Sequence, residues 1–338
     1  MKTKITDVAK QAGVSIATVS HVINGTRHVT DATRKKVEDA IHILDYSPDI
    51  SARGLKTGKK NLVGLITPDL GNRFFSLILE EIEDELSLHG YNAVVVNTRE
   101  NCNREVSGLK LLTSGITDGI IIASSFQNYR DIATYIPKGF PSVHIDRLPR
   151  GYQGDSVRVS SFSAVKEATA DLLREGHIRI GYIASLARLS STEERLQGYE
   201  CALKEAGLSL DPALIKQGDS HSRSGYLCMQ QLVEEGVRAV FISNSLMASG
   251  ALTYLDNCGM RIGQDIQVAS MRDYEWHRFQ RESIRTVEQP GREMARLAAR
   301  RILERIERPD EAGSEILLQA TYHKEGEHSG TDNVFPVF

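Results

Sequence analysis

The chain has 338 residues, of which 41% are hydrophobic and 25% are charged, a composition typical of a globular protein with two or three domains. No apolar run approaches the roughly 20 residues of a membrane-spanning helix, so we expect no membrane span. The net charge of −3 is unevenly divided: residues 1–60 hold eleven Lys and Arg against six Asp and Glu, a net charge of +5, so the remaining 278 residues carry −8. This asymmetry predicts that the first 60 residues contact a polyanion.

Residues 1–4 lead directly into a helical pattern without an apolar signal-peptide stretch, so we expect a cytoplasmic protein. No catalytic motif appears, and we expect no enzyme activity, no cofactor and no metal site. The four cysteines lack metal-ligand spacing and are interpreted as reduced packing residues: Cys102, Cys201, Cys228 and Cys258.

Residues 5–24 contain two short helical patterns that meet at Gly13. Thr6 and Asp7 are placed to cap the first helix, and Ser15 can cap the second. The second helix has one apolar face, formed by Val19, Val22 and Ile23. Four residues are left on its other sides: Ile16, Ala17, Thr18 and His21. The pattern predicts a helix-turn-helix whose second helix is free to enter a major groove.

A third helix is predicted over 29–46, with Thr30 as its cap, followed by a linker over 47–60. In the linker, Ser47 and Pro48 announce a short helix. Because Gly54 costs about 1 kcal/mol relative to Ala, this helix is marginal on its own. We expect it to order only on DNA.

From residue 62 onward, short apolar runs alternate with amphipathic helices, a pattern that predicts parallel, doubly wound sheets. The predicted strands are 62–67, 93–97, 119–123, 142–146, 180–183, 239–242 and 266–270. The predicted helices are 74–89, 104–114, 129–136, 162–175, 193–206, 224–234, 247–258 and 292–306. Since the pattern restarts after Gly151, we expect two similar halves with a ligand crevice at the carboxyl ends of their strands.

Two stretches carry a family resemblance, DVAKQAGVSIATVSHVIN and YSPDISARGLKTGKKNLVGLITPDL. They resemble the lactose-repressor (LacI/GalR) family of bacterial transcription regulators, and the match continues to near the C-terminus. The resemblance implies an all-α helix-turn-helix head (1–46), a hinge helix or linker (47–60) and a periplasmic-binding-protein-like α/β core (61–338). We expect chain crossings between the halves near 154–161, near 270–285 and after 315. The expected halves are 61–158 with a crossing segment near 271–285, and 159–270 with 286–315.

Motif and resemblance together predict residues that contact operator DNA. In related regulators, paired hinge helices of a dimer insert a leucine into the minor groove, and Leu55 occupies that place here. Ile16, Ala17 and His21 are expected to read bases, and Arg27, Lys56 and Asn24 to contact phosphates. The full predicted set is Thr6, Ser15, Ile16, Ala17, Thr18, His21, Asn24, Arg27, Ala52, Leu55 and Lys56.

The resemblance also implies effector contacts in the crevice: Phe74, Phe75, Asp146, Ser191, Arg195, Asn244, Arg272 and Asp273. Three departures stand out: Ser245 replaces a common Asp, Ser220 sits where several members place an aromatic residue, and Arg272 stands where a sugar-binding Asp is usual. Arg195 and Arg272 could offer two guanidinium forks, which predicts an anionic effector such as a sugar acid or sugar phosphate. Alternatively, Arg272 pairs with Asp273, Glu275 or Asp146, and the alignment shifts by one residue so that Asp273 takes the carboxylate role.

We interpret the chain as a homodimeric, effector-responsive repressor of a sugar or sugar-acid catabolic operon, binding an approximately palindromic operator. The alternatives are an enzyme with a doubly wound core behind a DNA-binding head, and a transport-type binding protein. The absence of a catalytic motif argues against the first, and the basic head argues against the second.

Overall fold

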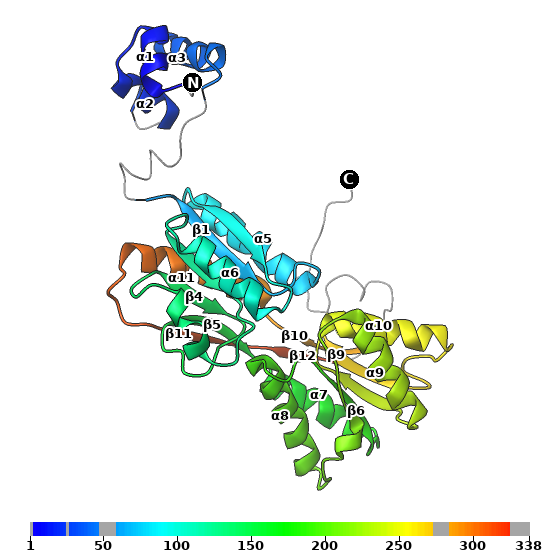
Figure 1. Cartoon of the computed structure of the whole chain (residues 1–338). Helices are drawn as coiled ribbons and strands as arrows, with labels where there is room; N and C mark the ends of the chain where they lie inside the picture. The colour runs from blue at the N-terminus through cyan, green and yellow to red at the C-terminus, as the bar shows by residue number, and fades with distance from the viewer. Residues whose placement is uncertain (1–2, 25–26, 47–58, 273–283, 325–338) are drawn as a thin grey trace. The chain divides into compact units, whose positions relative to one another are not determined.

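The computed structural model describes residues 3–24, 27–46, 59–272 and 284–324 (Figure 1). The chain divides into two compact units, residues 1–60 and 61–338, and each is described by itself. None of the described helices is long and apolar enough to cross a membrane.

The first unit, the head, is a bundle of three helices: α1 (Ile5–Ala12), α2 (Ile16–Asn24) and α3 (Asp31–Ile43). Val8, Val19 and Val37, one from each helix, are fully buried in its core. Within α2 and α3 the buried residues lie three apart, Val19 with Val22 and Val37 with Ala40, which is the spacing of one helical face. The third helix is shorter than predicted and begins directly after Thr30.

The second unit, the core, contains two six-stranded sheets. The first sheet has the strand order β11-β5-β4-β3-β1-β2, and all of its strand pairs are parallel. Its strands are β1 (Leu62–Thr67), β2 (Asn92–Asn97), β3 (Gly119–Ile122), β4 (Ser142–Ile145), β5 (Asp155–Ser160) and β11 (Glu315–Gln319).

The second sheet has the order β12-β10-β9-β8-β6-β7, with only β12 antiparallel to its neighbour. Its strands are β6 (Ile180–Ala184), β7 (Ile215–Gln217), β8 (Ala239–Ile242), β9 (Gln267–Met271), β10 (Ile284–Glu288) and β12 (Thr321–His323). The prediction of two doubly wound, parallel-rich halves is confirmed.

Helices cover both faces of each sheet (Figure 1). On the first sheet, α5 (Arg73–Leu88) and α11 (Gly291–Glu307) pack on one face and α6 (Cys102–Leu112) on the other. On the second, α7 (Phe162–Arg174) and α8 (Ser190–Glu205) pack on one face, and α9 (Ser222–Glu234) and α10 (Ser245–Asn257) on the other. The short 3₁₀ helices are η1 (Tyr129–Asp131), η2 (Ala133–Tyr135) and η3 (Pro212–Leu214).

Helix α11 belongs to the first half, which corrects the expected assignment of residues 286–315 to the second. Its buried apolar face is part of the same hydrophobic cluster as strands β1, β4 and β5 of the first sheet: Met294, Ala295, Ala298, Ala299 and Ile302. Strand β10, in contrast, pairs with β9 in the second sheet. The second half therefore extends through Glu288, and after the final crossing only β12 belongs to it.

In the part of the core that the structure describes, the chain passes between the halves three times, and one of these passages is not where it was expected. The first passage follows β5 at Ser160, and the third lies at Ala320, between β11 and β12; the Ala320 amide donates to the Ser160 carbonyl at 2.8 Å. The second passage lies at Gln289–Pro290 and not near 270–285, because β9 and β10 are neighbours in one sheet. The helix predicted over 129–136 is also wrong, since two 3₁₀ turns, η1 and η2, stand there.

Both sheets reverse their strand order at an equivalent place, between β1 and β3 in the first and between β6 and β8 in the second. In open α/β sheets, ligands bind beyond the carboxyl ends of the strands at such switch points. The fold therefore directs attention to the loops that follow β1, β4, β6, β8 and β9.

Candidate functional sites

The turn between α1 and α2 is built by Gly13 and Ser15. Gly13 ends α1 with φ of 67°, a left-handed conformation that glycine adopts without strain. The Ser15 hydroxyl accepts a hydrogen bond from the Thr18 amide at 3.1 Å, so Ser15 caps α2 as predicted. At the start of α1, the Asp7 carboxylate accepts from the Lys4 amide at 2.8 Å, whereas Thr6 lies inside the helix and is not its cap.

The residues predicted to contact DNA lie mainly on the outside of the head. Ile16 is 49% exposed although it is a large aliphatic side chain, and Ala17 beside it is also exposed. Of the others, Thr6, Ser15 and Arg27 are exposed, and Thr18 and His21 are half-buried. The other predicted contacts, Ala52, Leu55 and Lys56 and the side chain of Asn24, lie outside the described residues. An exposed aliphatic residue at the start of α2 leaves a surface that can contact a base edge.

In the core, loops from both halves form a cleft at the carboxyl ends of the strands, here named the effector cleft. It is lined by Asn72, Phe74, Phe75, Asp146, Arg147, Ser185, Leu189, Ser191, Thr192, Arg195, Asn244, Ser245, Met271, Arg272 and Gln289. Seven of the eight predicted effector residues are thus brought together, and the eighth, Asp273, lies outside the described residues. The cavity has a volume of only about 30 Å³, far below the roughly 300 Å³ at which small-molecule pockets begin.

Phe74 and Phe75 enter the cleft from the first turn of α5, whose Asn72 cap accepts from the Phe74 amide at 3.1 Å. Their rings contact edge-to-face with centroids 5.3 Å apart. Phe75 is buried in the first-half core and Phe74 packs against it half-buried, so Phe75 is a core residue that also lines the cleft.

Asp146 follows β4 and is held in a left-handed conformation with φ of 62°, which is strained for a non-glycine residue. Burial raises the pKa of its carboxyl above the usual range. Its oxygens have only long contacts, 3.4 Å from the Gln289 amide nitrogen and 3.6 Å from Nε of Arg147. The carboxylate therefore retains acceptor capacity for a ligand.

Arg147 is fixed by Glu100 through two bonds of 2.8 Å, and its guanidinium lies 5.3 Å from the centroid of the Phe75 ring. Burial alone would raise the pKa of Glu100, but the neighbouring Arg147 charge lowers it below its usual range. Sequence reasoning missed both residues. The available signal was the pair of charges, Asp146 and Arg147, directly after a buried strand.

Arg195 enters the cleft from α8, donating to the Ser243 carbonyl at 2.8 Å and to the Gln289 side-chain oxygen at 3.1 Å. Burial lowers the pKa of this guanidinium. Ser191 lies one turn before it on α8. Asn244 caps α10 by accepting from the Met247 amide at 2.9 Å. Sequence reasoning also missed Gln289, a polar residue at the passage between the halves.

Arg272 forms an ion pair with Glu288 across neighbouring strands of the second sheet. The same carboxylate lies 2.9 Å from Nε2 of His323 on β12. Glu288 is not one of the three acids suggested by the sequence, of which Asp273 and Glu275 lie outside the described residues. The expectation of an anionic effector depends on the guanidinium groups of Arg195 and Arg272. Of these two groups, that of Arg272 is engaged by Glu288.

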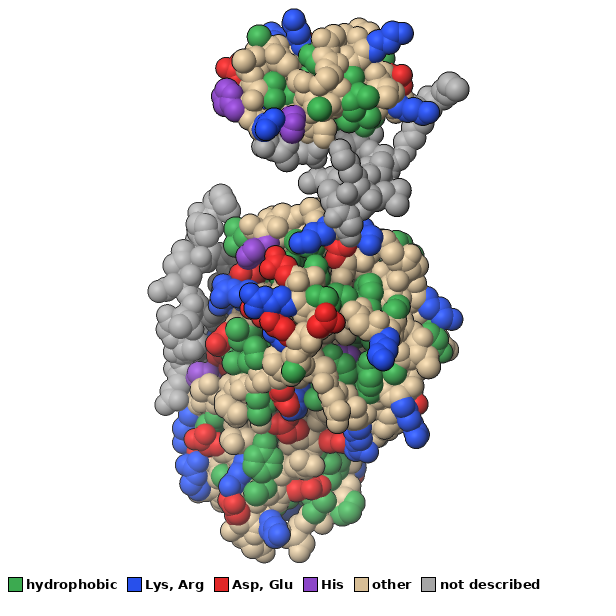
Figure 2. Space-filling view, turned by 90° about the vertical axis from the view of Figure 1, so that its left-hand side faces the viewer, with side chains coloured by type: hydrophobic (Ala, Val, Ile, Leu, Met, Phe, Trp, Pro, Cys, Tyr) green, Lys and Arg blue, Asp and Glu red, His purple; other side chains and the backbone are tan. Residues whose placement is uncertain are grey.

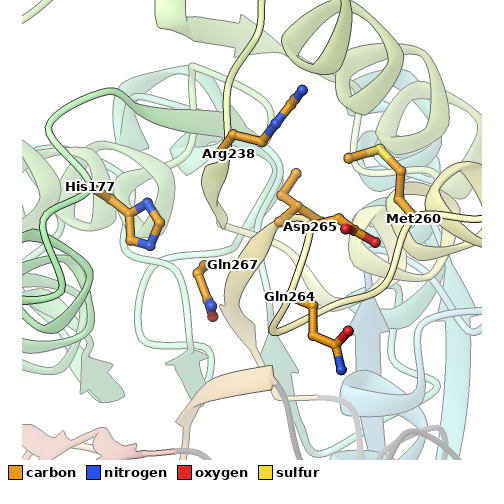
Figure 3. Close-up of a pocket in the computed structure, with 7 residues that line it drawn as sticks. His177, Arg238, Met260, Gln264, Asp265 and Gln267 are labelled. Carbon is orange, nitrogen blue, oxygen red and sulfur yellow. The ribbon is translucent and has the colours of Figure 1, made fainter.

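A second pocket of about 420 Å³ lies at the amino ends of the second-sheet strands, the opposite end from the effector cleft (Figure 3). The pocket is lined by His177, Arg238, Met260, Gln264, Asp265, Ile266 and Gln267, none of which was predicted as a site residue from the sequence. Asp265 is already bound by Arg261 through Nε at 2.9 Å and Nη2 at 3.1 Å. The cleft, not this pocket, has the convergent buried polar groups of a ligand site.

Comparison with known proteins gives two family matches. Residues 4–49 match the bacterial regulatory proteins of the lacI family, and residues 169–325 match a periplasmic binding protein-like domain. The chain is 32% identical to the HTH-type transcriptional repressor PurR of Mannheimia succiniciproducens, over 90% of this chain and 92% of that one. It is also 32% identical to the ribose operon repressor of Haemophilus influenzae, over 93% of this chain and 95% of that one.

Solved structures agree. A Lac repressor dimer bound to operator and the anti-inducer ONPF matches with a TM-score of 0.81 and 26% identity, covering 96% of this chain and 99% of that one. A complex of the transcriptional regulator CelR with cellobiose matches with a TM-score of 0.72 and 28% identity, over the same shares.

A helix-turn-helix head joined to a two-sheet core with a polar cleft defines a DNA-binding regulator that responds to a small molecule. The chain belongs to the lacI family of bacterial regulatory proteins.

Proposed function

We propose that this chain is a homodimeric repressor of a carbohydrate catabolic operon, released from or recruited to its operator by a sugar that binds in the effector cleft. The observation that carries the proposal is the convergence of Asp146, Arg195 and Asn244 in one cleft, in a chain that also carries the lacI-type head. A two-fold dimer presents the head twice, so the operator is an approximate palindrome. The protein acts on DNA in the cytoplasm and has no catalytic role of its own.

The unsatisfied polar atoms of the cleft favour a hydroxylated effector over an anionic one. Among the described residues, Nε of Arg147 and Nε of Arg195 are buried donors without a hydrogen-bond partner. The Asp146 carboxylate beside them has spare acceptor capacity. A hydroxyl group accepts from a donor and donates to a carboxylate at once, whereas a ligand carboxylate would meet Asp146 as a like charge.

The charge balance of the cleft points the same way. Arg147 is paired with Glu100 and Arg272 with Glu288, which leaves Arg195 to be balanced by Asp146. The cleft groups and their partners are therefore close to neutral. We propose that the effector is a neutral sugar, in place of the sugar acid or sugar phosphate suggested by the sequence.

A thermal-shift panel tests the effector class. Ribose and cellobiose are compared with their aldonic acids and with ribose 5-phosphate, because a related repressor and a related regulator complex carry these sugars in their names. A sugar at 100 times its dissociation constant stabilises by about 2.7 kcal/mol. Stabilisation by a neutral sugar is expected to vanish in Asp146→Ala and to persist in Arg272→Ala. Stabilisation by acids or phosphates alone, lost in Arg272→Ala, would restore the anionic effector.

For the DNA, selection on randomised duplexes tests the operator. The full chain is expected to enrich an approximate palindrome whose half-sites depend on the identities of residues 16 and 17. Enrichment of a single asymmetric half-site would contradict a dimer with two equivalent heads.

A further inference from the structure

Arg188, in the loop between β6 and α8, reaches from the second half to the first. Its Nε donates to the Ser125 carbonyl at 3.1 Å and its Nη2 to the Glu100 carbonyl at 2.7 Å. Both acceptors lie in first-half loops, beyond β2 and β3. Arg188 itself is not part of the cleft lining, so it holds the rim of the cleft and not its floor.

Two other contacts join the same rims. The Leu148 amide donates to the Ser190 hydroxyl at 3.1 Å, and Arg150 contacts both carboxylate oxygens of Glu193 at 2.7 and 2.8 Å. Arg150 is 61% exposed, and such surface pairs contribute little. Because a guanidinium that donates to two carbonyls makes charge-assisted bonds, Arg188 is the strongest of the three contacts.

The residue that Arg188 grips is also the residue that positions Arg147. Glu100 is held at its carbonyl by Arg188 from the second half, and its carboxylate holds Arg147 inside the cleft. Arg99 and Glu100 have φ of 52° and 56°, left-handed values that non-glycine residues adopt only where surrounding contacts impose them. Loss of the Arg188 contact would remove the restraint that the second half places on Glu100, leaving the first-half bond from the Glu100 amide to the Pro68 carbonyl at 2.9 Å.

The cavity between the rims, about 30 Å³, is too small for any sugar. The rims, or the side chains that fill the cleft, must therefore move before a sugar can bind.

We propose that Arg188 is a positioning residue that latches the two halves closed and, through Glu100, sets the place of Arg147 in the cleft. The latch acts without touching the effector, so it controls entry to the site and not the chemistry of recognition. The inference goes beyond the proposed function, because it concerns contacts between the halves outside the cleft lining and holds whichever small molecule binds.

Hydrogen exchange of the ligand-free full chain, followed by mass spectrometry, tests the latch. In Arg188→Ala, amides in residues 98–102, 124–127 and 146–150 are expected to exchange about tenfold faster, because opening of the rims exposes them. The amides of the buried strands β3 and β8 are expected to keep their protection. Arg188→Lys, which keeps the charge but loses the fork, is expected to fall between Arg188→Ala and the wild type.

The matched control is Arg223→Ala, which removes an exposed arginine of the same half on α9. Two results would overturn the proposal. One is exchange in the three rim segments equal to that of Arg223→Ala. The other is a uniform increase that includes β3 and β8, which would mark Arg188 as a residue of general stability. Because the readout needs no ligand and no DNA, failure of the latch is distinguishable from failure of the proposed sugar effector.

Discussion

Arg195, on α8 of the second half, donates a hydrogen bond at 3.1 Å to the side-chain oxygen of Gln289, which lies where the chain passes from the second half to the first. The amide nitrogen of the same Gln289 donates to Asp146 of the first half at 3.4 Å. One side-chain amide therefore joins two oppositely charged cleft residues from different halves, at the point where the chain passes from β10 to α11.

Gln289→Leu is expected to destabilise the core by about 1–3 kcal/mol, because it leaves a buried guanidinium nitrogen and a buried carboxylate without their partner. Urea unfolding of the full chain measures the loss. The control is Gln319→Leu on β11, where the side chain is exposed and the expected change is small. Equal effects of the two variants would show that the amide bridge contributes nothing.

Ile16 carries a prediction about operator choice. Replacement of Ile16 by Asn exchanges an aliphatic contact for a group that can bond bidentately to adenine, so the preferred base at one operator position is expected to change. The discrimination involved is about 1–3 kcal/mol for the base concerned. Selection on randomised duplexes reads the change, and an unaltered preference would show that α2 has been given the wrong role.

Leu55→Ala is expected to weaken specific operator binding severely while leaving folding and effector affinity near wild type, if the residue wedges a base step. Lys56→Ala is the comparison. It should weaken binding to all DNA and reduce the log–log salt slope by roughly 0.9 for a lost phosphate contact. Fluorescence anisotropy on operator and on unrelated DNA separates the two, and full specific affinity in Leu55→Ala would remove the wedge.

His144 on β4 predicts a pH dependence of stability. It is fully buried between Tyr129 and Tyr152, and burial lowers its pKa from 6.5 to about 3. Below pH 6.5 the unfolded chain binds a proton that the folded chain does not, so the free energy of unfolding falls by about 1.4 kcal/mol per pH unit until the folded pKa is reached. Above pH 6.5 this group contributes no pH dependence.

His144→Phe is therefore expected to lose about 2 kcal/mol less than the wild type between pH 7 and pH 5. Urea unfolding at both pH values measures the difference. The same pH dependence in His144→Phe and the wild type would show that His144 is not held neutral.

The sequence predicts the positions of helices and strands along the chain better than it predicts which elements pack against each other. The apolar face of α11 can be predicted from the spacing of its residues. A face made mainly of Met and Ala does not indicate, however, which of the two sheets the helix packs on. Its assignment to the wrong half follows from that. The segment 129–136 has helical spacing, yet the chain tightens into 3₁₀ turns there.

For the site, residues after strand ends could be predicted because the ends of parallel strands converge. Asp146 and Asn244, both named from the resemblance, each follow a strand and line the cleft. Contacts that depend on the spatial approach of distant segments could not be found. Glu288 lies 16 residues from Arg272 along the chain and pairs with it only because β9 and β10 are adjacent. Arg188 gives no local signal at all.

The three passages between the halves also determine when each half can complete its folding during synthesis. The head needs only residues that leave the ribosome first, but the first half must wait for α11 and β11, residues 291–319, which are translated after the whole second sheet except β12. Until then Phe75, Ile78 and Ile82 of α5 lack part of the surface that covers them. A nonsense mutation before residue 291 would thus produce a DNA-binding head attached to a first half that cannot complete its hydrophobic core.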